Sequence, residues 1–377
     1  MLISICQDVI EKGIDVNDND HQYAIEALKM LLMAVKWNKH IVCVLDLDEK
    51  DIRNFTNILS KEEIKLLEFI HSKRQRSRDL LNKLYIYTKI TFQEETKKTG
   101  NVIVYNPRTH TDFELYEETH FIVENILDAQ YYSQVVCKYC SVSNRLNHIS
   151  LKYYPVQGGG ATISDVIRNE LKLKQHFCII VCDSDKKFEG AEEEGDTAKG
   201  VKNIFSNLKN EETDFHFDFY VMSKVREIEN LIPFCVLEQY DKSKKDFISQ
   251  YKNHLSFYDM KIGLDYKILF DKEIYDEWKT VFKDKINWKK IDLYKKITHS
   301  REEFNEKIKE LPAWNICWGK NLLKNVLNPK LKGNKNDKQY KLYDIKCGDL
   351  TNNQQYEWDE IGKRVISWCC CFANPPR

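Results

Sequence analysis

Acidic residues follow three short apolar runs in the middle of this chain. Glu124 comes directly after Phe121-Ile122-Val123, and Asp128 lies four residues further on. Two aspartates follow the run 177–182, and two glutamates come shortly after the run 215–222. Clustered carboxylates repel one another unless a cation neutralises them, and Mg²⁺ prefers oxygen ligands and substrate phosphates. The pattern therefore predicts a Mg²⁺ or Mn²⁺ site that acts on phosphate, with the ligands Glu124, Asp128, Asp183, Asp185, Glu227 and Glu229.

The elements that must position these acids are predicted to be parallel strands. Each run is short, rich in β-branched or aromatic residues and bounded by turn or acidic residues, as buried strands are. A further run, 151–156, precedes a glycine triplet, and the segments 125–139, 162–174 and 196–209 suit helices. Alternating strands and helices indicate an α/β fold, a Rossmann-like core with a parallel sheet flanked by helices. Ligands bind beyond the carboxyl ends of such strands, where the acids stand.

The glycine triplet Gly158-Gly159-Gly160 has two interpretations. Its backbone N–H groups can approach a phosphate at the start of the following helix. Alternatively, the triplet is a tight strand-to-helix turn that needs positive φ angles. The two interpretations are compatible.

In order and spacing, these motifs resemble the TOPRIM fold. Val123-Glu124-Asn125-Ile126-Leu127-Asp128 is similar to its glutamate motif, and Asp183-Ser184-Asp185 is similar to its paired-aspartate motif. The glycine triplet and Arg226-Glu227-Ile228-Glu229-Asn230 resemble the subgroup found in OLD-family nucleases and in stand-alone TOPRIM effectors of phage-defence systems such as PARIS. Two departures are visible, since Asn125 stands where the family usually has glycine, and Lys186 and Lys187 replace a third acid. The second departure disfavours a topoisomerase or primase subtype.

The resemblance implies a metal-dependent nuclease that hydrolyses DNA or RNA, including tRNA, as an anti-phage effector. The expected catalytic residues are Glu124, Asp128, Asp183, Asp185, Glu227 and Lys224, with Lys224 or Arg226 offsetting charge in the transition state. It also implies an ABC-type, OLD-like ATPase partner. This chain has no GxxxxGK[ST] phosphate loop, so ATP hydrolysis by the chain itself is not expected. A homodimer is a further expectation. The alternatives are a non-catalytic module that senses a nucleotide or a partner, and an enzyme of topoisomerase or primase type.

Composition favours a reduced, cytoplasmic protein. The formal net charge of the 377-residue chain is +0, so nucleic-acid binding must depend on local basic patches. We find no signal peptide and no apolar run of about 18 residues, so no membrane contact is expected. The chain has 12 cysteines, and without an export signal disulfides are not expected. Cys137-Lys138-Tyr139-Cys140 lacks the second pair of ligands that a structural zinc needs.

The predicted core is flanked by two other regions, which gives three predicted domains. Residues 1–118 are expected to be helical up to about residue 82, with a helix over 21–37, and then to form a β-hairpin or meander from strands at 84–88, 102–105 and 113–116. Residues 119–233 form the TOPRIM core, and residues 234–377 form a mainly helical region rich in aromatic residues and lysine. The lysine-rich stretch 320–346 is the best candidate there for nucleic-acid binding.

A rival acidic motif occurs in the first region. The run 41–45 mimics a strand that ends near Asp46 and Asp48. The simpler interpretation is that Asp48 opens the next helix, because acidic residues stabilise the positive end of a helix.

Overall fold

The computed structural model describes residues 1–109, 114–142, 146, 148–208, 215–311, 316–328 and 346–374. The chain forms two compact units. Unit 1 comprises Met1–Cys182, Lys199–Tyr220 and Asp359–Arg377, and unit 2 comprises Asp183–Ala198 and Val221–Trp358. The division therefore differs from the three consecutive domains expected from the sequence. The unit boundaries fall after β9 and inside α7, β10 and α14, where composition gives no signal.

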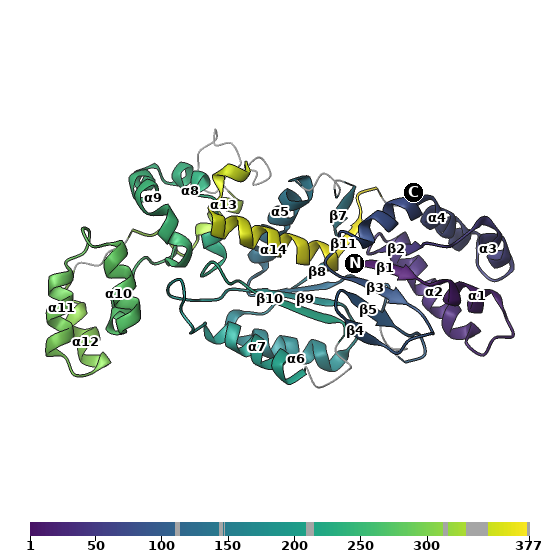
Figure 1. Cartoon of the computed structure of the whole chain (residues 1–377), viewed down its shortest axis with the longest axis horizontal. Helices are drawn as coiled ribbons and strands as arrows, with labels where there is room; N and C mark the ends of the chain where they lie inside the picture. Colours follow the sequence, from purple (N-terminus) through teal and green to yellow (C-terminus); the bar gives the residue numbers. More distant parts are fainter. Residues whose placement is uncertain are drawn as a thin grey trace. The chain divides into compact units, whose positions relative to one another are not determined.

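Unit 1 begins with a five-stranded sheet of order β2-β1-β3-β5-β4 (Figure 1). Its strands are β1 (Leu2–Ile5), β2 (Ile41–Val44), β3 (Tyr87–Ile90), β4 (Lys97–Thr99) and β5 (Val102–Tyr105). All neighbouring pairs are parallel except β4 with β5. Its helices are α1 (Gln7–Ile14), α2 (His21–Lys36), α3 (Glu49–Asn54) and α4 (Lys61–Leu81).

This region is correctly predicted only in part. The helix over 21–37 and the strand at 41–44 are confirmed, and the first part is mostly helical, as expected. The strand β1, which pairs in parallel with β2, was not predicted. The hairpin expected from the strands at 84–88 and 102–105 is wrong, because β3 and β5 pair in parallel and the antiparallel partner of β5 is β4. The strand expected at 84–88 is β3, which begins at Tyr87. The prediction of a strand at 113–116 was wrong for residues 114–116, which form no strand. Phe113 lies outside the described residues.

The second sheet of unit 1 has the order β10-β9-β6-β8. Its strands are β6 (His120–Val123), β8 (Tyr154–Gln157), β9 (Cys178–Cys182) and β10 (Phe217–Val221), and β6 pairs in parallel with both β8 and β9. The expected helices are confirmed as α5 (Ile126–Val142), α6 (Ile163–Leu173) and α7 (Asp196–Leu208). Figure 1 shows α5 on one face of this sheet and α6 on the other. The α/β class with helix-flanked parallel sheets is thereby confirmed.

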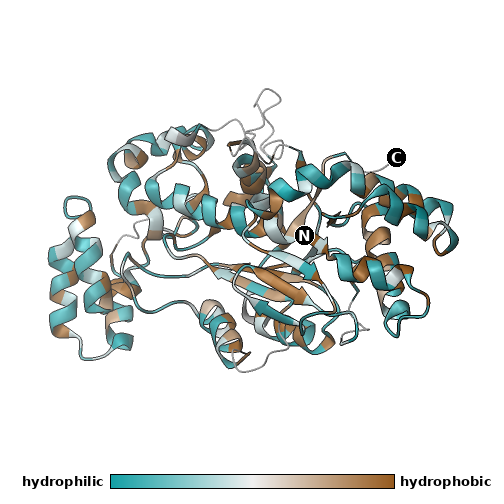
Figure 2. Cartoon of the chain, turned by 45° about the vertical axis from the view of Figure 1, so that its right-hand side comes forward, coloured by the Kyte–Doolittle hydropathy of each residue, from teal (hydrophilic) through white to brown (hydrophobic). Residues whose placement is uncertain are grey.

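The run expected at 151–156 is two strands rather than one. β7 (Ile149–Leu151) pairs antiparallel with β11 (Cys370–Phe372), whereas β8 pairs with β6. Pro155 lies in β8, which is an edge strand, where a missing N–H group costs little. All residues of β9 are buried, and Figure 2 shows the strands of this sheet as largely hydrophobic.

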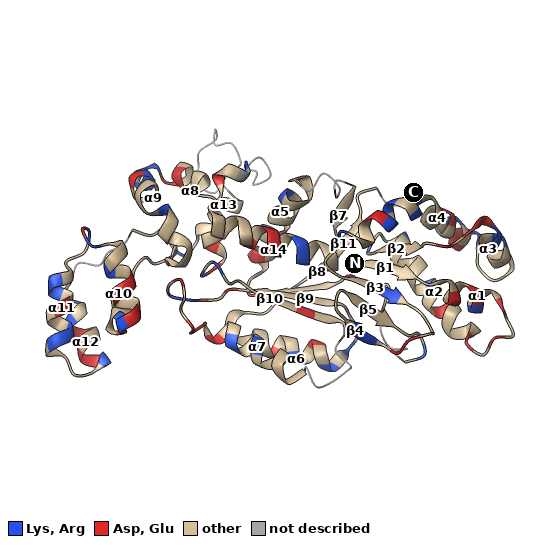
Figure 3. Ribbon diagram, in the orientation of Figure 1, with Lys and Arg blue, Asp and Glu red and all other residues tan. Residues whose placement is uncertain are grey.

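Unit 2 is mainly helical, as expected for the region after residue 234. It contains α8 (Phe234–Tyr240), α9 (Lys245–Tyr251), α10 (Lys272–Val281), α11 (Trp288–Ile297), α12 (Arg301–Ile308), α13 (Leu322–Leu327) and the start of α14 (Asn352–Cys369). Figure 3 shows both signs of charge on α10, α11 and α12. Most of the lysine-rich stretch, 329–345, lies outside the described residues.

Candidate metal centre

Three of the predicted ligands come together in unit 2. One carboxylate oxygen each of Asp183, Glu227 and Glu229 lies within 4.8 Å of the others. Both glutamates are buried, with relative exposures of 2% and 5%. Such a set of oxygen donors suits a hard divalent cation.

The backbone after residue 226 fixes these carboxylates. Glu227 precedes a short 3₁₀ helix, Ile228–Leu231, and forms a reciprocal capping box with Asn230. The Ile228 N–H group donates to Asp183 Oδ1 at 3.0 Å, which ties the aspartate to the same turn. Asn230 is buried, and its amide donates to the carbonyl oxygens of Leu255 and Tyr258. The turn is therefore held on both sides.

The segment after Asp183 is attached to the same turn. The N–H groups of Ser184 and Asp185 both donate to the Arg226 carbonyl oxygen, at 3.1 and 2.9 Å. Asp185 adopts a left-handed conformation with φ of 54°, which aspartate tolerates better than most residues. Gly195 lies against it, because a Cβ at Gly195 would be 2.5 Å from Asp185 Oδ2. The close approach explains glycine at that position.

Lys261 provides the positive charge nearest to the cluster. Its Nζ lies 2.9 Å from Glu227 Oε2 and 3.4 Å from Glu229 Oε2. Although burial lowers the pKa of Lys261, the neighbouring carboxylates outweigh this effect and raise the pKa well above its usual value. Burial, followed by repulsion from Glu229, raises the pKa of Glu227 to about 7. Glu227 and Glu229 therefore share one ammonium group, that of Lys261.

Two buried oxygens of the cluster are not satisfied by hydrogen bonds. Glu227 Oε1 and Glu229 Oε2 have no hydrogen-bond partner, although Glu229 Oε2 has its ion pair with Lys261. Buried oxygens of this kind are costly unless a donor or a cation satisfies them. The donor set and these oxygens fit a divalent cation held by Asp183, Glu227 and Glu229.

Two further basic groups belong to this part of unit 2. Arg226 Nη2 lies 2.8 Å from Asp259 Oδ2, and both side chains are mostly buried. Lys187 is half-buried, and burial lowers the pKa of its amine, with repulsion from Arg226 adding to the effect. The predicted catalytic Lys224 is exposed, while its backbone N–H donates to Glu357.

Two other predicted ligands, Glu124 and Asp128, lie in unit 1. Glu124 follows β6 directly and is half-buried. Asp128 is buried, and its Oδ2 accepts a hydrogen bond from the Asn125 N–H group at 2.8 Å. The Leu127 N–H group in turn donates to Asn125 Oδ1. Asp128 and Asn125 therefore stabilise the start of α5 in this structure, and metal binding by Asp128 stays a prediction.

The glycine triplet forms a tight turn beside Glu124. The N–H groups of Gly158 and Gly159 donate to the carbonyl oxygens of Val123 and Glu124, at 2.6 and 2.9 Å. In this structure both N–H groups are used within the turn, and their approach to a phosphate stays a prediction. Gly160 has a φ of 60°, and a Cβ there would be 3.9 Å from Glu124 Oε2. Phosphate contact stays a prediction for Gly160.

No motif or spacing pattern selects Lys261 or Asp259. Both stand about 30 residues after the glutamates, in a stretch without a strand or a recognisable motif. Only the fold of the segment 252–261 brings them to the cluster.

Comparison of the chain with known proteins found no matching family model, no matching curated protein and no matching solved structure. The site must therefore be interpreted from its own chemistry. No helix among the described residues is long and apolar enough to cross a membrane.

Proposed function

We propose that this chain is a Mg²⁺- or Mn²⁺-dependent nuclease of the TOPRIM type that hydrolyses phosphodiester bonds in DNA or RNA. The observation that carries the proposal is the carboxylate cluster of Asp183, Glu227 and Glu229, with two buried oxygens that lack hydrogen bonds. Structural ion pairs normally match charge for charge, whereas here two buried carboxylates, those of Glu227 and Glu229, share the ammonium group of Lys261. A divalent cation would balance the excess negative charge.

The sheet topology gives independent support. Across the four-stranded sheet the strands lie in the order β8, β6, β9, β10. In chain order these are the second, first, third and fourth strands of this sheet. Glu124 follows the first strand, Asp183 follows the third, and Glu227 lies six residues after the end of the fourth. Acids after these strands are the feature in which the sequence resembles the TOPRIM nucleases.

The chain's own residues have distinct proposed roles. Asp183, Glu227 and Glu229 would hold the cation, which when bound supplies an electrophile for the phosphate and an acidified water. Arg226 is fixed by Asp259 and keeps the turn that carries the glutamates in place. Lys187 and the exposed Lys224 would bind the phosphate backbone of the substrate. Burial lowers the pKa of Lys187, so a phosphate partner would stabilise its charged form.

The test is cleavage of plasmid DNA, single-stranded DNA and total RNA including tRNA by the purified protein, with Mg²⁺ or Mn²⁺. We expect metal-dependent cleavage of at least one substrate, and its loss in D183A. The matched control is E192Q, which changes an exposed acid in the same unit. Cleavage that survives in D183A, or that persists in chelator, contradicts the proposal.

A second candidate function is a non-catalytic module that senses a nucleotide or a partner. It is favoured by Lys261, because this internal ammonium group allows the cluster to exist without a metal ion. This function predicts metal-dependent binding of nucleotide or nucleic acid without any turnover.

By its resemblance, the proposal extends to a cytoplasmic anti-phage effector that an ATPase partner holds inactive. Expression in cells tests this extension. We expect the wild-type chain to be toxic without the partner and the D183A variant to be harmless. Equal toxicity of both variants would contradict it.

A further inference from the structure

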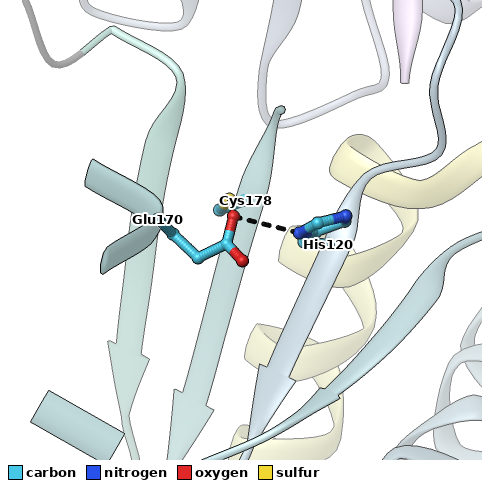
Figure 4. A group of neighbouring side chains, drawn as sticks. All are labelled: His120, Glu170 and Cys178. Carbon is cyan, nitrogen blue, oxygen red and sulfur yellow. Dashed lines mark hydrogen bonds and ion pairs between the residues drawn. The ribbon is translucent and has the colours of Figure 1, made fainter. Parts of the chain in front are cut away.

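A second group of potential metal ligands lies in unit 1, apart from the acidic cluster of unit 2. His120 begins β6, Cys178 begins β9, and Glu170 belongs to α6. His120 and Cys178 are partners in the parallel register of the two strands, so both stand at the amino-terminal edge of the sheet. Figure 4 shows the three side chains pointing toward one another.

The distances between these side chains suit a small metal ion. His120 Nδ1 lies 3.1 Å from Glu170 Oε2, and Cys178 Sγ lies 4.0 Å from the same oxygen. One ligand atom of each residue lies within 4.8 Å of the others. In a tetrahedral zinc site with bonds of about 2.0–2.3 Å, ligand atoms are about 3.3–3.8 Å apart. Shifts of the three ligand atoms by less than about 1 Å would therefore bring them to the separations of a zinc site.

His176 lies beside the group. Its ring centroid lies 4.1 Å from that of His120, and the thiol of Cys178 donates to the His176 carbonyl oxygen at 3.5 Å. The Nδ1 atom of His176 is buried and has no hydrogen-bond partner. Its ring nitrogens do not belong to the group of atoms within 4.8 Å of one another, so the ring must shift before it can bind the same ion.

The mostly buried carboxylate of Glu170 is a further feature that suits a bound cation. Its side chain is only 12% exposed, and among the ion pairs of the described residues its partner is His120. A mostly buried carboxylate is costly unless a positive charge or hydrogen bonds compensate it. A divalent ion would provide this charge.

We propose that His120, Glu170 and Cys178 form a site for a borderline divalent transition metal, Zn²⁺ first, which His176 would join as a fourth ligand once its ring shifts. Imidazole and thiolate select such an ion, whereas the all-oxygen cluster of unit 2 selects Mg²⁺ or Mn²⁺. The ion would join α6 to β6 and β9. Since α6 follows the glycine turn 158–160, the site would also fix the turn that lies beside Glu124.

Cobalt substitution in the full-length protein tests the proposal. The protein is stripped of metal with a chelator and titrated with Co²⁺ and with Zn²⁺. We expect one equivalent of Co²⁺ to give the sulfur-to-cobalt charge-transfer band and the visible bands of tetrahedral coordination. Zn²⁺ should displace it and, at a hundredfold excess over Kd, raise the Tm by about 3 °C.

Variants locate the site. C178S and H120Q should each lose the charge-transfer band and the Zn²⁺-induced shift, whereas C137S, which changes an exposed cysteine, and D183N should keep both. Circular dichroism shows which variants are folded, and E170Q replaces any that are not. A wild-type protein without the band, or a band that persists in both C178S and H120Q, overturns the proposal.

Discussion

Replacing Lys261 with methionine should destabilise the metal-free protein and tighten its binding of Mg²⁺. The ammonium group lies 2.9 and 3.4 Å from two buried carboxylates. At an effective dielectric constant of about 20, these pairs attract by about 6 and 5 kcal/mol. Desolvation cancels much of this attraction, and the lysine side chain is 33% exposed. We therefore expect a net loss of about 2 kcal/mol in the free energy of unfolding, less than the 3–5 kcal/mol typical of fully buried pairs.

The same change removes the competitor of the metal ion. In the wild-type protein a bound cation must share or displace the lysine's carboxylate partners, whereas in K261M this competing ammonium group is absent. We expect the Kd for Mg²⁺ to fall about tenfold, which corresponds to about 1.4 kcal/mol of the attraction estimated above. Mg²⁺ should then restore the stability that the variant has lost.

Urea unfolding at pH 8 in chelator, followed by titration calorimetry with Mg²⁺, measures both effects. K242M is the matched control, because Lys242 is an exposed lysine of the same unit. The reasoning is refuted if K261M is as stable as K242M in chelator and binds Mg²⁺ no more tightly.

Three further predictions concern the two units separately. Because the pKa of Glu227 is raised to about 7, Mg²⁺ affinity should rise with pH and level off above about pH 7, and titrations from pH 5.5 to 8.5 that show no such rise would contradict this. Because the pKa of Glu227 is raised, its carboxyl group contributes stability to the folded state that is fully present below about pH 4.5 and is lost as the pH rises through 7. In metal-free buffer, E227Q should therefore be more stable than the wild type at pH 8 and differ little from it at pH 4, as urea unfolding would show. G158A should lower the free energy of unfolding by about 2 kcal/mol or more, because the new Cβ would lie 2.4 Å from Ile163. The control G100A should lower it by about 1 kcal/mol, because only its φ of 60° is unfavourable for alanine. Equal losses in the two variants, measured by urea unfolding, would contradict the packing argument.

The sequence allowed correct prediction of the two central strands of the second sheet. β6 and β9 were predicted because each contains an apolar run that is followed by an acid. Helices α5, α6 and α7 were predicted from the helix-compatible segments between the strands. β1 was missed because a short, mainly apolar run at the chain start fits either a buried strand or a helix.

The candidate site shows the same limit. Asp183, Glu227 and Glu229 were selected because they follow strands, and the structure brings them together. Lys261 could not be selected, because its role depends on the path of the chain after α9. His120, Glu170 and Cys178 belong to three separate elements, and only the register of β6 with β9 and the packing of α6 unite them.

The central claim is most directly tested by Mn²⁺-dependent cleavage rates of wild type, E227Q and the control E192Q, measured side by side on the preferred substrate. Both variants remove one negative charge, but only Glu227 belongs to the buried carboxylate cluster. We predict that E227Q loses at least about a hundredfold in rate, as expected when transition-state charge stabilisation is lost, while E192Q keeps the wild-type rate. Equal rates in all three proteins, or cleavage in the wild type that needs no metal, would contradict a metal-dependent nuclease built on this cluster.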